Sequence, residues 1–426
     1  MKALHAVAAV RRAERAKQIL ATSQRRGAAR IAIAGTSLWL VLATAAAAAQ
    51  SALPRDVHPD TRNRLPPLQR DALSDQMKKA YDAAASAPGG TLQGVAAIRL
   101  HRSGVDVRWD ARIGRRLSEL AILTIAREYD QPYEWSLHEM EALSVGLEPR
   151  IADVVRNRTA LTGVGDKEAA IIQLGREIGQ HRVTPETYAR ALKLFGKTDL
   201  VDMVDLMSNY AGTGVNLTAA NQWMPPQMKQ FLPLPFTMPD DILPDSRSRI
   251  PVVNPARPQQ ANAGGDGANA GLYRRTLAPA PTGPGSMARF AAGLKSLESS
   301  QGKALIALAA LLTARLHDQQ YQWTMTELSA VKDGLSPATI DIVRTNKATT
   351  GLPAKEAVLI EFGRELLGRH NVSAETYARA KMTFGQQDLS DLVVNVIVPH
   401  TREAVLLTVF DQHLPAGQRP LLPTRD

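Results

Sequence analysis

Apolar residues recur along the chain at the spacing of α-helices. Leu117, Leu120, Leu123 and Ile125 fall at helical spacing within a helix predicted over Arg116–Glu128. Prolines at helix starts, glycines after helix ends and Ser or Thr caps delimit the other predicted helices. These are Asp75–Ala85, a helix from Pro132 that stops before Gly146, Arg150–Arg156, Lys167–Gly179, Glu186–Phe195 and Leu200–Ala220. No stretch shows sustained strand alternation with hairpin turns, so the sequence predicts an all-α fold.

The same helical pattern occurs twice. Gly146–Ile178 aligns without gaps on Gly334–Leu366, and nearly half of the aligned positions are identical. Val183–Asp199 aligns on Val372–Asp388, where more than half of the positions are identical. A repeat of about 190 residues is too long for a solenoid and indicates a duplicated domain. We expect the two copies to pack as a pseudo-two-fold pair.

The segment between the copies has the composition of a linker. Residues 225–285 hold twelve of the chain's 26 prolines, together with a run rich in Ala, Asn and Gly. Such a segment buries too little apolar surface to offset its ordering entropy. The expected organisation is a signal peptide at 1–49, a first helical domain at 50–224, a linker at 225–285 and a second helical domain at 286–426.

The amino-terminal residues have the pattern of an export signal. A basic stretch is followed by an uncharged run from Ile31 to Ala49, which ends in consecutive alanines. We therefore expect an exported protein, periplasmic or secreted, with cleavage after Ala49 or Ala52. Paired arginines leave both general secretion and twin-arginine export open. The alternative is an uncleaved anchor, because an uncharged run of this length is just sufficient to span a bilayer.

Composition removes several classes of function. The net charge is +10, but residues 1–49 carry +7 of it, and no basic stripe with interleaved aromatics is present. We therefore expect no nucleic-acid partner. The chain has no cysteine, which excludes disulfides, Cys-ligated metal centres and thiol peroxidase chemistry. No Gly-rich phosphate loop and no metal-ligand spacing of histidines occur, so neither a cofactor nor a metal is expected.

Three ionisable residues form a candidate proton-transfer unit. Glu119 lies in one predicted helix, and Glu134 and His138 lie four positions apart on one face of the next. If these helices pack antiparallel, Glu119 approaches that face from the opposite wall. A carboxylate can orient an imidazole and tune its pKa. Structural roles are the alternative: Glu134 as a helix cap, His138 as a half-buried side chain and Glu119 in an ion pair with an arginine.

Three stretches around these residues carry a family resemblance: Arg116–Arg127 (RLSELAILTIAR), Tyr133–Glu139 (YEWSLHE) and Gly146-Leu147. They are similar to the carboxymuconolactone decarboxylase family, which is related to the alkylhydroperoxidase-D-like proteins. The resemblance covers roughly residues 64–224 and, more weakly, 286–415. In the peroxidase branch two cysteines occupy the positions of Gln131 and Glu134. The chain therefore resembles the acid–base branch.

The resemblance implies two alkylhydroperoxidase-D-like helical domains and a lyase that decarboxylates, or moves a proton on, a small organic acid or lactone. In that interpretation His138 is the general acid/base, Glu134 orients it or relays a proton, and Glu119 completes the relay. Guanidinium groups suit a carboxylate substrate. The residues expected to contact the substrate are Arg116, Arg127, Tyr133 and Trp135.

The second copy lacks this chemistry. The residues at the positions of Glu119, Glu134 and His138 are Ala307, Gln322 and Thr326. We therefore expect an active site in the first copy alone. The alternative is a non-catalytic helical module that binds a ligand or a partner protein. Self-association through the helical domains is expected, and membrane contact only through an uncleaved leader.

Overall fold

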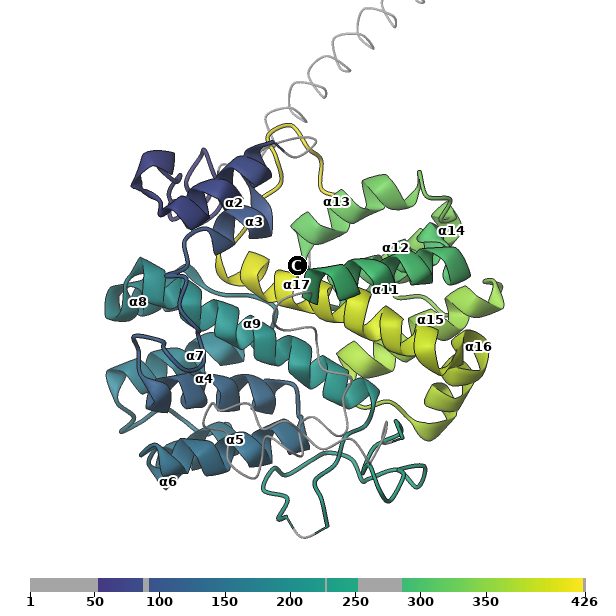
Figure 1. Cartoon of the computed structure of the whole chain (residues 1–426), viewed down its shortest axis with the longest axis horizontal. Coiled ribbons are helices and arrows are strands. Elements are labelled where there is room, and N and C mark those ends of the chain that lie inside the picture. Colours follow the sequence, from purple (N-terminus) through teal and green to yellow (C-terminus); the bar gives the residue numbers. More distant parts are fainter. Residues whose placement is uncertain (1–52, 87–91, 227, 252–285, 424–426) are drawn as a thin grey trace, which may run out of the picture. The chain divides into compact units, whose positions relative to one another are not determined.

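The computed structural model describes residues 53–86, 92–226, 228–251 and 286–423, and their regular elements are helices with no β-strand (Figure 1). The described residues from Asp56 onward form one compact unit. The expected signal peptide and residues 252–285 of the expected linker lie outside the described residues. The helices of the first half are α2 (Asp75–Ala85), α3 (Gly94–Arg99), α4 (Arg115–Glu128), α5 (Pro132–Ser144), α6 (Pro149–Arg156), α7 (Asp166–Gly179), α8 (Pro185–Phe195) and α9 (Lys197–Ala219), preceded by the short turn η1 (Arg70–Ala72).

The second half repeats the order of the first from α4 onward. Its elements are α11 (Ser286–Gln301), α12 (Lys303–Leu316), α13 (Gln320–Ala330), α14 (Pro337–Arg344), α15 (Ala354–Gly363), η2 (Arg364–Gly368), α16 (Ala374–Leu392), η3 (Val393–Ile397) and α17 (Val398–Val409). The distance along the chain from the start of α4 to the start of α12 is the same as that from α5 to α13. The repeat found in the sequence is therefore also a repeat of structure.

Local sequence explains where the helices end. Ser74 caps α2 and Thr184 caps α8, each through its side-chain oxygen. Gly196, with φ 75°, separates α8 from α9, and Gly385, with φ 77°, breaks α16 at the matching position. The widened turn η3 follows, and Pro399, which has no N–H to donate, lies just beyond it in α17. Helix α3 is an element that the sequence patterns did not predict.

One hydrophobic core joins the two halves. It includes Leu120 and Leu123 of α4 together with Leu308 and Leu311 of α12, all fully buried. Helices α9 and α17 lie side by side between the halves (Figure 1). The absence of a side chain at Gly212 lets α17 approach closely, because an added Cβ would lie 3.0 Å from Val398. The two copies are thus parts of one packed body.

A second, shorter repeat consists of two segments that each contact both halves. Asp56–Pro66 and Asp241–Pro251 share the pattern Asp-x-x-Pro-Asp-(Thr/Ser)-Arg-x-Arg-(Leu/Ile)-Pro. The side chain of Arg64 donates to Val183 O in the first half and to Val409 O in the second.

Arg249 occupies the matching position in that repeat. Its guanidinium donates to Val372 O in the second half, and its backbone N–H donates to Ala220 O in the first. Each segment therefore ties the two halves together. This part of the expected linker is an ordered component of the fold, and Arg249 is buried within it.

Four aromatic rings meet where the halves touch. Tyr129 stacks on His370 with ring centroids 5.2 Å apart, and His181 lies 5.1 Å from His317. The Tyr129 hydroxyl lies 3.3 Å from Nε2 of His317, whose Nδ1 lies 2.8 Å from Thr313 O. Because Nδ1 donates to that carbonyl, Nε2 accepts from the tyrosine. The chain repeat makes Tyr129 the counterpart of His317 and His181 the counterpart of His370.

By length and composition, one stretch among the described residues could cross a membrane. It spans Ala374–Val409, and 67% of its most apolar window is buried inside the body. Core helices of a folded protein meet the same criteria, and this stretch supplies core residues to the second half.

Candidate active site

Helices α4 and α5 form an antiparallel pair, in which Glu119 of α4 faces His138 of α5. The chain reverses at Asp130, which has φ 47°, and the side chain of Gln131 then caps α5 by accepting from Tyr133 N at 2.8 Å. Pro132 occupies the first turn of α5, as the sequence predicts. The antiparallel packing expected from the sequence is therefore present.

A buried carboxylate–imidazole pair forms the centre of the site. Nδ1 of His138 lies 2.7 Å from Oε2 of Glu119, and the side chains are 2% and 0% exposed. Nη2 of Arg115 lies 2.8 Å from the other oxygen, Oε1. Burial raises the pKa of Glu119, but the hydrogen bond with His138 and the charge of Arg115 hold it below its usual value. Glu119 is therefore ionised at neutral pH and accepts a hydrogen bond from Nδ1–H of His138.

The other imidazole nitrogen, Nε2 of His138, makes no hydrogen bond within the described part of the chain. The ring edge packs against Tyr210 of α9, with centroids 4.8 Å apart. Burial and three neighbouring carboxylates raise the pKa of Tyr210, although the charge of Arg108 opposes them. The phenol is therefore a neutral O–H group beside the imidazole.

Glu134 is not bonded to this pair, and its pKa is raised. It is fully buried, and neither carboxyl oxygen has a hydrogen-bond partner within the described residues. Burial raises its pKa well above the usual value, and the charge of Arg108 offsets this only in part. The capping role considered from the sequence is filled by Gln131 instead. Since Glu119 holds the imidazole, the role of orienting His138 belongs to Glu119 and not to Glu134.

The site becomes more exposed and more charged toward the surface. Arg115 and Arg108 each form an ion pair with Glu141, with shortest N–O distances of 3.2 and 3.0 Å. Both guanidinium groups lie over the ring of Trp109, at 4.0 and 4.5 Å from its centroid. Trp109 is 41% exposed. A layer of two arginines and one carboxylate therefore separates the buried pair from solvent.

The residues expected to contact the substrate have other partners. Arg116 pairs with Glu168, and Arg127 pairs with Asp130 and donates to Arg156 O. Neither guanidinium is bonded to Glu119 or His138. The structure puts Arg108 and Arg115 at this site instead, because Arg115 is one helical turn before Glu119.

The two aromatic residues of the motif are buried packing residues. The indole N–H of Trp135 donates to Glu139 at 2.7 Å, and Arg156 lies over its ring. Tyr133 packs in a small apolar cluster with Leu137 and with Leu217 of α9. Both are at most 1% exposed. They shape the scaffold behind the site.

The second half repeats the packing residues of this region but not its ionisable residues. Trp323 donates to Glu327 at 2.6 Å and Arg344 pairs with the same carboxylate, which reproduces the Trp135 arrangement. Arg315 and Asp318 likewise reproduce Arg127 and Asp130. The ionisable residues around His138 are all changed in the second half: Lys303 for Arg115, Ala307 for Glu119, Gln322 for Glu134, Thr326 for His138, Ser329 for Glu141 and, because the widened turn η3 adds one residue, His400 for Tyr210.

Glu119, His138 and Glu141 also meet the spacing for a metal ion, with ligand atoms within 4.8 Å of one another. Arg115 lies within ion-pair distance of both carboxylates, and Arg108 adds a second positive charge to Glu141. The carboxylates are thus already neutralised by guanidinium groups. This donor set does not fit a resident cation, which would have to displace Arg115.

The sequence patterns did not single out Arg108, Glu141 or Tyr210. Tyr210 comes from α9, which follows α5 only after three intervening helices, so no local spacing could connect it to His138. The signal that was present lies in the repeat, because Glu141 and Tyr210 are replaced by Ser329 and His400 in the second copy.

No protein-family model matches this chain, and no curated protein or solved structure matches it. The internal repeat therefore supplies the comparison that separates the scaffold from the site.

Proposed function

We propose that the first half of the protein is an acid–base active site that moves protons on a small organic acid or lactone, without a cofactor, in the manner of the carboxymuconolactone decarboxylases that its sequence resembles. One observation carries the proposal. The buried imidazole of His138 has one nitrogen held by an ionised carboxylate and the other left for a substrate. A carboxylate partner of this kind fixes the tautomer of a histidine that acts as an acid or base.

His138 is the proton-transfer group in this proposal. Loss of carbon dioxide from an activated acid leaves an electron pair on carbon, and that carbon must take up a proton. In this step Nε2 of His138 first takes a proton from water and then gives it to the carbon, which returns the imidazole to its neutral form, while Nδ1–H remains bonded to Glu119. General acid–base catalysis of this kind contributes about 10²- to 10⁴-fold to a rate.

Glu134 and the two arginines act on the substrate in different ways. A neutral carboxylic acid is a hydrogen-bond donor to an oxygen on which negative charge develops, and Glu134 stays protonated well above the usual carboxylate range. Arg108 and Arg115, on the exposed side of the pair, provide forked donors for a carboxylate. In this proposal a carboxylate of the substrate replaces Glu141 as the ion-pair partner of the two arginines.

We extend the proposal to the organisation of the chain. The two halves are a pseudo-two-fold pair of alkylhydroperoxidase-D-like domains, which is supported by the reciprocal contacts of Arg64 and Arg249. The protein is exported, periplasmic or secreted, as its leader pattern suggests, and it associates with itself through helical faces. A non-catalytic binding module is the competing function.

The test is turnover of a panel of unsaturated lactone acids by the full chain. His138→Ala and Glu119→Gln are expected to lower kcat/KM by about 10²-fold or more, since each removes part of the proton-transfer unit. The matched control is Thr326→Ala, because Thr326 occupies the place of His138 in the second half. That variant is expected to retain full activity.

Two results would contradict the proposal. Turnover that is unchanged in His138→Ala and Glu119→Gln, with both variants folded by circular dichroism, would remove these residues from the chemistry. Saturable binding of the panel with no turnover would favour the non-catalytic module.

A further inference from the structure

The candidate site around His138 is buried, so a substrate can reach it only if part of the protein moves. The side chains of His138 and Glu119 are almost fully inaccessible to solvent. Trp135 and Tyr133 pack behind them and are buried as well. Toward solvent, Arg115 bonds to Glu119 and is itself only partly buried. The contacts therefore indicate that the way in lies on the side of Arg115.

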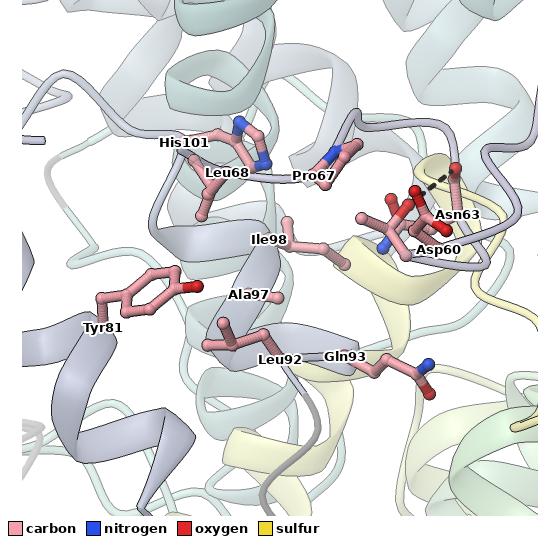
Figure 2. Close-up of a pocket in the computed structure, with 11 residues that line it drawn as sticks. Asp60, Asn63, Pro67, Leu68, Tyr81, Leu92, Gln93, Ala97, Ile98 and His101 are labelled. Carbon is pink, nitrogen blue, oxygen red and sulfur yellow. Dashed lines mark hydrogen bonds between the residues drawn. The ribbon is translucent and has the colours of Figure 1, made fainter. Parts of the chain in front are cut away.

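A cavity of about 270 Å³ in the first half does not supply this way in. It is lined by residues 60–68, by Tyr81 of α2, and by α3 with the residues that flank it, of which His101 is the last (Figure 2). None of the residues that line it belongs to the site around His138 or to residues 104–111, which follow it in the chain. The cavity is therefore separate from the site.

Residues 104–111 lie between α3 and α4 and contact the site on its solvent side. The guanidinium of Arg108 forms an ion pair with Glu141 of α5. The ring centroid of Trp109 lies 4.0 Å from Cζ of Arg115. Nη1 of Arg115 also donates to Arg108 O at 3.1 Å. Three contacts therefore hold this segment against α4 and α5.

The segment is attached at both ends to α9 and has little buried surface between these points. Ser103, just before it, donates through its backbone N–H and its hydroxyl to Asp202. Arg112, just after it, forms an ion pair with Asp199. Between these two anchors, Val107 is the one buried side chain. A segment with so few buried contacts is the kind that opens locally while the rest of the fold stays intact.

The second half has a helix at the same position. Helix α11 extends to Gln301 and is separated by one glycine from α12, the counterpart of α4. By the chain offset that relates these two helices, Leu297 of α11 is the counterpart of Trp109. Leu297 is fully buried, whereas Trp109 is 41% exposed in a segment without regular structure. The half that lacks the ionisable residues is thus covered by a packed helix, and the half that has them is covered by a loosely packed segment.

We propose that residues 104–111 form a movable cover over the His138 site and that Trp109 holds this cover closed. The inference rests on the proposed function, because a cover is useful only if a substrate must reach Nε2. Opening breaks the contact of Trp109 with Arg115 and the ion pair of the cover with Glu141. A substrate carboxylate that takes the place of Glu141 breaks the second of these contacts, so binding and opening are coupled.

Modification of His138 by diethyl pyrocarbonate measures how often the cover opens. The reagent acylates an unprotonated imidazole nitrogen, and Nε2 of His138 makes no hydrogen bond within the described residues. Peptide mass spectrometry of the full chain gives the rate at each histidine. In the wild type His138 is expected to react slowly, because only the open form exposes it. The measurement needs no turnover, so it is independent of whether the site is catalytic.

Variants of Trp109 test its role in closing the cover. Trp109→Ala removes the cation–π contact with Arg115 and is expected to raise the rate at His138 by about fivefold or more. Trp109→Phe keeps an aromatic ring and is expected to stay within about twofold of the wild type. The matched control is Met325→Ala, because Met325 is also 41% exposed but lies in the second half. This control, and the rate at the buried His317 in every variant, are expected to match the wild type.

The proposal is overturned if Trp109→Ala leaves the rate at His138 unchanged, or if Trp109→Phe reacts as fast as Trp109→Ala. It is also overturned if Met325→Ala has the same effect, or if the rate at His317 rises in parallel, since the whole fold and not the cover would then open. Each of these results leaves the proton-transfer proposal intact. Conversely, a chain that shows the expected rates but no turnover would contradict the proposed function alone.

Discussion

Replacing Glu134 by glutamine tests whether this carboxyl group is kept neutral by its surroundings. Glutamine has nearly the same shape, and the second half already carries it at the matching position, Gln322, which is 5% exposed and donates to His400 O. The substitution removes the ionisable proton and retains the packing. Any change in stability that varies with pH then comes from the carboxyl group alone.

The magnitude follows from proton linkage. Burial raises the folded-state pKa of Glu134 well above 4.5, the value in the unfolded chain. At any pH between the unfolded-state and the folded-state pKa, the folded protein therefore holds a proton that the unfolded chain has lost. The contribution of Glu134 to stability is therefore complete below about pH 4.5 and decreases as pH rises toward the folded-state pKa. The decrease is about 1.4 kcal/mol per pH unit. It reaches about 3 kcal/mol by pH 7 for a group still protonated there.

Urea unfolding of the full chain at pH 5, 6, 7 and 8 measures this effect. Relative to the wild type, Glu134→Gln should gain stability steadily as the pH rises, whatever constant offset its amide introduces. The control is Glu177→Gln. Burial opposes ionisation of Glu177, but hydrogen bonds from Thr187, Gln173 and Thr184 lower its pKa. Its stabilising contribution is complete above the unfolded-state pKa, so this variant should show a constant deficit from pH 5 to 8.

Parallel curves for the wild type and Glu134→Gln would refute the reasoning. They would mean that Glu134 ionises in the folded protein at its usual pKa, and a hydrogen-bond donor with a raised pKa could not then be part of the site.

Two further predictions concern the contacts between the halves. Arg249→Ala leaves Val372 O without its donor and should reduce the unfolding free energy by about 2–4 kcal/mol in urea titrations. The control is Arg190→Ala, which removes an exposed ion pair with Asp166 and should cost less than about 1 kcal/mol. Equal losses in the two variants would contradict the interface role of Arg249. Burial lowers the pKa of His317 to about 4. Its contribution to stability is therefore complete above about pH 6.5 and is lost at about 1.4 kcal/mol per pH unit as the pH falls toward 4. In thermal unfolding, His317→Gln should flatten the decline in stability that the wild type shows over this range, and an unchanged slope would show that His317 is not kept neutral.

Local signals were enough to predict most helices and the approach of Glu119 to the face of α5 that carries His138, but not that Glu119, rather than Glu134, bonds to the imidazole. Pro132 and the chain reversal before it determine how α4 and α5 turn back on each other. Once that turn is fixed, Glu119 and His138 face each other because each lies two to three helical turns from it. The antiparallel hairpin and the Glu119–His138 contact are therefore consequences of spacing.

The remaining site residues depend on tertiary packing. Arg108 precedes α4 in a segment without periodicity, and Tyr210 reaches His138 only because α9 packs against α4. The state of Glu134 depends on how completely α9 covers it, and no local pattern encodes that burial. Arg116 and Arg127 illustrate the opposite case. Their side chains point to Glu168 and Asp130, a choice of helix face that the sequence left open.

The replacement of the site's ionisable residues in one half has a genetic consequence. In an assembly of identical chains, a mutation that replaced His138 would remove it from every subunit at once. Joining two copies in one reading frame lets selection hold the first while the second changes freely at Lys303, Ala307 and Thr326. The second copy then needs to keep only what supports its neighbour, such as the Trp323–Glu327 bond and the rings around His317.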